Sequence, residues 1–148
     1  LFRSDLMRHL APEGACYQAG TLSGNPCAVA AGLATLRLAQ RAGFYQRQAA
    51  ALTGLITGLR DAAAAAGVPL QLAQAGTMWG WFVSDRAVTD FASAAACDLE
   101  RWRRIATALI AHGINIAPSP FEAAFWSAAH GAREIAATLR AARAAFRA

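Results

Sequence analysis

The sequence predicts an α+β fold, in which a small antiparallel sheet carries helices on one side. Two observations lead to this prediction. Apolar residues recur at three- and four-residue spacing through several long segments, whereas the spacing falls to two in residues 70–83. The resulting order is helix, helix, strand, strand, helix, strand, strand, helix, which is typical of an α+β layer. A chain of 148 residues is long enough for one domain with its own core.

The first part of the chain is predicted to be helical. Residues 1–17 are expected to form a short amphipathic helix followed by a loop. Asn25 is a good N-cap for a second helix, because its side-chain oxygen can accept hydrogen bonds from the first turn. Pro26 suits the first helical position, where its missing N–H would have no partner within the helix. Gly43 ends that helix, and a longer one runs up to Gly67. The apolar positions of the pair are Val29, Leu33, Leu36, Tyr45, Ala49, Leu52, Ile56, Leu59 and Ala63.

The middle of the chain is predicted to be a strand pair and a third helix. Strands are expected over residues 70–72 and 78–83, with a bend at Gly76 between them. Residues 98–112 return to the helical spacing, and Gly113 ends this helix. Glu100 and Arg104 lie four residues apart on it, so we expect them to form an ion pair.

The last part of the chain is predicted to contain two short strands and a helix. The strands are expected over residues 114–117 and around residues 125–127, and the helix over residues 132–147. At about 100° per residue, one face of this helix is apolar and another is basic. The apolar face carries Ile135, Leu139, Ala142 and Phe146, and the basic face carries Arg133, Arg140, Arg143 and Arg147. We expect the basic face to be solvated.

Composition excludes several classes of protein. The longest apolar stretch, residues 27–36, is half of the roughly 20 residues that a membrane span needs, so we expect no membrane span, and the first residues do not have the pattern of a signal peptide. The net charge of +5 comes from scattered residues, which argues against nucleic-acid binding. The three cysteines form no CxxC pair, so we expect no disulfide framework, no metal site and a reducing cytoplasm.

Three further features indicate that the chain is part of a larger assembly. Hydrophobic residues make up 56% of the chain and charged residues only 16%, so we expect part of its surface to meet another chain or a missing domain. All 14 basic residues are arginine, so this chain alone cannot do chemistry that needs an amine side chain. The chain also opens on Leu1 within what reads as a structured segment, so we expect a truncated product.

The stretch GTLSGNP, residues 20–26, has two interpretations. Asn25 as a cap explains its Asn-Pro pair, and short capped turns are common. Capping does not explain Thr21 and Ser23, whose hydroxyls lie beside glycines ahead of a helix N-terminus. Such a place suits an anion such as a phosphate. Both interpretations remain open from the spacing alone.

A second candidate site is the stretch PSPFEAAFWSAAH, residues 118–130. Glu122 stands among apolar and aromatic residues, so its carboxylate is either desolvated, with a raised affinity for a proton, or exposed at an edge. Ser119, Ser127 and His130 are expected to act as local caps or hydrogen-bond partners. No nucleophile elbow surrounds either serine, so serine-histidine catalysis is not predicted.

Longer strings of the sequence resemble a known family. YQAGTLSGNPCAVAAGLATL, residues 17–36, resembles the segment after the cofactor lysine in glutamate-1-semialdehyde 2,1-aminomutases, and PSPFEAAFWSAAH and AGTMWGWFVSD resemble later parts of the same enzymes. The shorter element T...GNP is shared across class III aminotransferases. Pro120 and the pair Trp79 and Trp81 depart from the pattern, which leaves room for altered substrate preference.

The resemblance implies a homodimeric fold-type I pyridoxal-phosphate (PLP) enzyme that isomerises glutamate-1-semialdehyde to 5-aminolevulinate for tetrapyrrole synthesis. It implies that Gly20 and Thr21 bind the cofactor phosphate of the partner subunit, and that Glu122 lies by the cofactor and substrate. Residues 1–40 would end the large domain and residues 41–148 would form the small C-terminal domain. The Schiff-base lysine would lie upstream, which leaves the chain inactive alone.

Two alternatives to the aminomutase remain. One is another class III aminotransferase, which would move an amino group from an ω-amine to a keto acid. The other is a non-catalytic dimerisation module that buries its apolar excess against a second copy.

Overall fold

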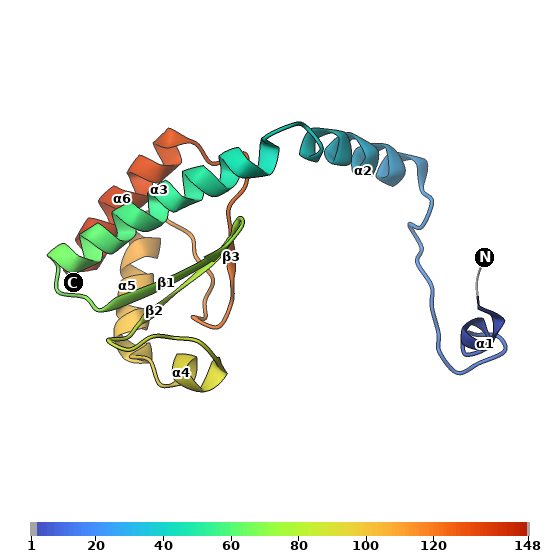
Figure 1. The fold of residues 1–148 in the computed structure, drawn as a ribbon, viewed down its shortest axis with the longest axis horizontal. Helices are drawn as coiled ribbons and strands as arrows, with labels where there is room; N and C mark the ends of the chain where they lie inside the picture. The colour runs from blue at the N-terminus through green and yellow to red at the C-terminus, as the bar shows by residue number, and fades with distance from the viewer. Residues whose placement is uncertain (1–2, 148) are drawn as a thin grey trace. The chain divides into compact units, whose positions relative to one another are not determined.

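The computed structural model describes residues 3–147, in two units. Residues Leu1–Arg41 form the first unit and Ala42–Ala148 the second, and each is described by itself. Figure 1 labels the elements of both units.

The first unit contains the helices α1, Ser4–Met7, and α2, Pro26–Ala39. The predicted short helix and loop are confirmed, although α1 is only four residues long. The chain turns back after α1 and brings Gly14 against the backbone of His9. A Cβ on Gly14 would lie only 2.1 Å from the His9 carbonyl carbon. A glycine is therefore required at that turn.

The predicted start of α2 is also confirmed. The side chain of Asn25 accepts hydrogen bonds from the backbone N–H groups of Cys27, at 3.0 Å, and Ala28, at 3.2 Å. Pro26 occupies the first turn, where no N–H is needed. The apolar face of α2 is open to solvent, as the exposed fractions of Val29 and Leu36 are 55% and 59%.

The second unit is an α+β layer with a three-stranded antiparallel sheet in the order β1-β2-β3, which confirms the predicted fold class. Its elements are α3 Phe44–Ala65, β1 Leu70–Ala75, β2 Met78–Val83, α4 Phe91–Ala95, α5 Leu99–Ala111, β3 Ala124–Phe125 and α6 Ala132–Ala145. Gly76, with φ of +62°, lies in the tight turn between β1 and β2.

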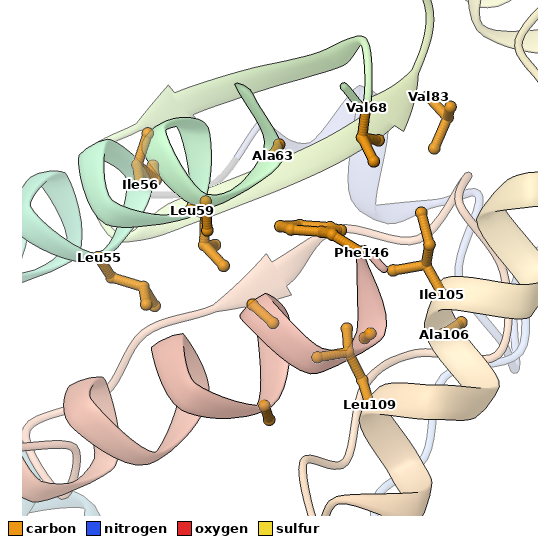
Figure 2. Packing of buried hydrophobic residues seen from close by; sticks show 14 of the residues in the cluster. Leu55, Ile56, Leu59, Ala63, Val68, Val83, Ile105, Ala106, Leu109 and Phe146 are labelled. Carbon is orange, nitrogen blue, oxygen red and sulfur yellow. The ribbon is translucent and has the colours of Figure 1, made fainter. Parts of the chain in front are cut away.

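One face of the sheet meets the helices. Helix α3 packs on β1, α5 packs on β2, and α6 packs on both helices. The sheet residues in this core are Leu70, Leu72, Trp79, Trp81 and Val83, which alternate along their strands as a shared face requires. Figure 2 shows the side chain of Phe146, at the end of α6, pointing between α3 and Ile105 of α5. Leu52 of α3 has no exposed surface.

Helices α5 and α6 lie close to the ranges that the sequence predicts. The side chain of Asp98 accepts a hydrogen bond from the Arg101 N–H at 2.8 Å and so caps α5. Gly113 follows with φ of +80°, and the predicted Glu100 and Arg104 pair forms at 3.1 Å. The arginine face of α6 is exposed and its apolar face contacts the core.

Three predictions about short elements differ from the structure. Residues 114–117 are not a strand, because Ile114 and Ile116 pack on the core without joining the hydrogen-bonded sheet. The strand expected around residues 125–127 is only Ala124–Phe125. Helix α4 was missed, although Asp90 and Ser93 form a capping box before it.

Glu134 gives α6 an acid-sensitive start. Its carboxylate accepts a hydrogen bond from the Gly131 N–H at 2.9 Å, and this bond is the main reason that the pKa of Glu134 lies below the usual 4.5. We expect the resulting stabilisation to be fully present above pH 4.5 and to be lost as the pH falls through the lowered pKa. Urea denaturation at a series of acidic pH values measures it.

The matched variants for this measurement are Glu134→Gln and, as a control, Glu100→Gln. The first should flatten the acid part of the stability profile, because glutamine has no carboxylate to protonate. The second removes the exposed ion pair between Glu100 and Arg104, which contributes little to stability, so its acid profile should match that of the wild type. Identical profiles for wild type and Glu134→Gln would contradict the assignment.

Candidate functional site

The turn before α2 presents several unused hydrogen-bond donors. The Ser23 N–H donates to the Gly20 carbonyl and the Asn25 N–H donates to the Leu22 carbonyl, both at 3.0 Å. Within residues 3–147, the N–H groups of Thr21, Leu22 and Gly24 and the Thr21 hydroxyl have no protein partner. Convergent backbone N–H groups and a hydroxyl are what an anion site needs.

The glycines of this turn keep it tight. A Cβ on Gly20 would lie 2.3 Å from the Ser23 hydroxyl oxygen, and Gly24 has φ of +73°. Only glycine adopts that φ without strain. Gly24 therefore sets the backbone shape of this turn, in which the Thr21 and Leu22 N–H groups have no protein partner among residues 3–147.

The cap and the anion interpretation use different donors. Asn25 takes the N–H groups of Cys27 and Ala28, and the Val29 N–H donates to the Asn25 carbonyl. The first turn of α2 therefore supplies its dipole and no spare N–H. Any hydrogen bond to an anion must come from Thr21 and its neighbours in the turn, so the two interpretations are compatible.

Glu122 lies in the second unit, where it lines a pocket of about 270 Å³ on the sheet face opposite the helices. Ala73 and Gly80 are directly paired across β1 and β2 and line this pocket. Because both side chains are small or absent, the sheet surface is recessed between Met78 and Phe82. Glu122 itself is exposed, so the desolvated carboxylate considered above is not found in this chain.

Helix α4, which sequence reasoning missed, contacts a residue that lines this pocket. Phe91, at the start of α4, contacts Phe121 with 5.6 Å between ring centroids. The Ser119 hydroxyl accepts a hydrogen bond from the Phe121 N–H at 3.2 Å, as predicted for a local cap. These two contacts fix the residue that immediately precedes Glu122.

The serine and histidine after β3 form a local hydrogen-bonded turn. His130 Nδ1 accepts from the Ser127 N–H at 3.1 Å, and the Ser127 hydroxyl accepts from the Ala129 N–H at 3.3 Å. This arrangement confirms their prediction as hydrogen-bond partners. His130 also lines a cavity of about 790 Å³ on the helix side of the sheet, but its Nδ1 is already used by the turn.

Other kinds of site are not found in the described part of the chain. Among residues 3–147, no group of three or more His, Cys, Asp or Glu side chains is placed to hold a metal ion, and no helix is long and apolar enough to cross a membrane. Cys16, Cys27 and Cys97 are free thiols.

The family Aminotransferase class-III matches residues 1–122, which is most of the chain and includes Gly20, Thr21 and Glu122. The chain belongs to the class III aminotransferases. This family consists of PLP-dependent enzymes. The predicted resemblance is thereby confirmed at the level of the family.

Solved structures of class III aminotransferase type share the fold. An omega-transaminase from Sphaerobacter thermophilus is 26% identical with a TM-score of 0.78, over 98% of this chain and 34% of that one. The FumI protein from Sphingopyxis sp. MTA144, solved in its PLP internal aldimine form, is 22% identical with a TM-score of 0.70, over 88% of this chain and 29% of that one. A transaminase with PLP bound is 23% identical with a TM-score of 0.70, over 97% of this chain and 33% of that one.

The class III chain described here spans about a third of these proteins. Gly20 and Thr21 lie in its first unit and Glu122 in its second. Sequence reasoning missed the pocket beside Glu122, because it forms only where Ala73 and Gly80 are paired across β1 and β2, and this pairing depends on the strand register. A small residue at the centre of each strand was its only signal.

Proposed function

We propose that this chain is part of a PLP-dependent aminomutase that converts glutamate-1-semialdehyde to 5-aminolevulinate in tetrapyrrole synthesis. The observation that carries the proposal is the turn at residues 20–25, whose spare donors suit a phosphate while the chain has no lysine to anchor a cofactor. The aminomutase-like strings around Thr21 and Glu122 support the specific reaction.

The residues present fit one part of the cofactor. Thr21 would hold the phosphate through its hydroxyl and N–H, assisted by the Leu22 N–H and by the positive end of the α2 dipole. In a homodimer this phosphate would belong to the partner subunit's cofactor. The Schiff-base lysine would come from a part of the enzyme upstream of Leu1. PLP, when bound, supplies the electron sink that lets an amino group move.

Glu122 would act on the substrate side. Its carboxylate is exposed in this chain beside an apolar pocket, so the remaining domain would have to cover it. Once it is covered, its negative charge would attract the protonated amino group of the substrate more strongly than in water. In this proposal residues 1–40 end the large domain, residues 41–148 form the small one, and the homodimeric enzyme works in the cytoplasm.

The reaction can be tested with the full-length enzyme and Glu122→Gln. We expect the variant to keep PLP and to lose about tenfold in kcat/KM for isomerisation, equivalent to about 1.4 kcal/mol of transition-state stabilisation relative to the free enzyme and substrate. Glu100→Gln, which alters only an exposed pair on α5, is the matched control and should retain full activity. Unchanged kinetics in Glu122→Gln would contradict the role of Glu122.

A second candidate is an ω-transaminase, favoured by the likeness to the Sphaerobacter enzyme. The two reactions differ in their need for a second substrate. An aminomutase converts glutamate-1-semialdehyde with no keto acid added, and over many turnovers isotopically labelled substrate nitrogen is recovered in the pool of 5-aminolevulinate. Turnover that depends on an added keto acid would reject the aminomutase and support the transaminase.

A further inference from the structure

The indole N–H of Trp102 has no protein acceptor. Trp102 lies on α5 with an exposed fraction of 3%, and its Nε1 is the buried side-chain atom within residues 3–147 that lacks a hydrogen-bond partner. The Trp81 ring is stacked on it with 5.1 Å between centroids. Leaving a buried N–H without a partner is unfavourable, and native structures seldom do so.

A small cavity lies beside this indole. Its volume is about 20 Å³, and it lies between the three tryptophans Trp79, Trp81 and Trp102 and the loop that leads to Glu122. One water molecule needs about 10 to 15 Å³ measured in this way. The cavity is therefore large enough for one water and too small for a substrate, a cofactor or an anion of several atoms.

The lining also determines where a water would bond. Indoles only donate hydrogen bonds, so the tryptophan side chains offer a water no acceptor. The loop residues that line the cavity include Ile116, Ala117, Ser119 and Glu122, which carry acceptors in their backbone carbonyls, the Ser119 hydroxyl and the Glu122 carboxylate. A water here would accept from Trp102 and donate to the loop.

The end of β3 leaves room for such a bridge. β3 pairs with β2 only at Met78 and Trp79, through Phe125 and Ala124. Continuing this antiparallel register by two residues would bring Glu122 opposite Trp81, but the loop leaves the sheet before that point. Within the described residues, the loop at Glu122 therefore has no ladder hydrogen bonds to β2, and its hydrogen bonds, such as that from the Glu122 N–H to the Ser119 carbonyl, lie within the loop.

We propose that one internal water binds in this cavity and links the Trp102 N–H of α5 to the loop at residues 116–122. Trp102 is then a positioning residue for Glu122. The water site does not depend on the reaction assigned to Glu122, since it rests on burial, cavity size and the donor inventory alone.

The test replaces the tryptophan by 3-benzothienylalanine, an isostere with sulfur in place of the N–H, in the 148-residue chain. The matched control is the same replacement at Trp126, whose N–H donates to Gln48 at 3.2 Å and which does not line this cavity. Urea denaturation gives the midpoint of each variant. Nuclear magnetic resonance gives cross-relaxation between the indole N–H and water, and the carboxyl carbon shift of Glu122.

The direction in which the urea midpoint changes in the Trp102 variant distinguishes a bridging water from an unpartnered N–H. With a bridging water, the wild-type Trp102 N–H shows cross-relaxation to a long-lived water, and the isostere lowers the urea midpoint and moves the Glu122 carboxyl signal. With a dry, unpartnered N–H, the isostere raises the midpoint, because an unfavourable group has been removed. The isostere at Trp126 should lower the midpoint and leave the Glu122 signal in place. A raised midpoint at Trp102, or a Glu122 signal that does not move, would overturn the proposal.

Discussion

Replacing Leu52 by alanine should lower the free energy of unfolding of the chain by about 2 to 5 kcal/mol, the range for a leucine lost from a packed core. Leu52 is fully buried among the side chains of the main core cluster, so its removal leaves a cavity as well as losing apolar contact. Urea denaturation followed by tryptophan fluorescence measures the loss, since Trp102 and Trp126 belong to the same cluster.

The matched control is Ile110→Ala. Ile110 lies on α5 with an exposed fraction of 53%, so removing its side chain should change stability by less than about 1 kcal/mol. Equal losses for Leu52→Ala and Ile110→Ala would mean that the second unit does not have the core described above.

Replacing Thr21 by valine should weaken PLP binding by the full-length enzyme about 10- to 100-fold. Valine keeps the shape of threonine and removes the hydroxyl, and a hydrogen bond to a charged group contributes about 1.5 to 3 kcal/mol. The dissociation constant, measured by equilibrium dialysis, gives the effect directly.

Thr35→Val is the control for this measurement. The Thr35 hydroxyl donates to the Ala31 carbonyl within α2 at 2.9 Å, so its loss should not change cofactor affinity. If Thr21→Val binds PLP as tightly as Thr35→Val, the turn is only a helix start and the phosphate lies elsewhere.

The longer elements could be predicted from the sequence because their signals are local. Asn25 marks the start of α2 through bonds to residues within the next turn, and Gly113 marks the end of α5 through its positive φ. The alternation through β1 and β2 is likewise readable, since each strand buries every second side chain on the helix face. These signals need no knowledge of the rest of the fold.

The short elements and the pocket could not be predicted in this way. Ile114 and Ile116 alternate like strand residues, but alternation reports burial and not hydrogen-bonded pairing. The environment of Glu122 depends on the pairing of Ala73 with Gly80 and on α4, which lie far from it in sequence. The turn at Thr21 was found because all of its parts are contiguous.

The edge formed by β1 affects how the chain behaves in concentrated solution. β1 has β2 on one side and no strand on the other among residues 3–147, and its sequence LQLAQA contains neither charge nor proline. Natural proteins usually protect such an edge with lysine, proline or a bulge. This edge is therefore open to pairing with a strand of a second molecule, so we expect the chain to self-associate as its concentration rises.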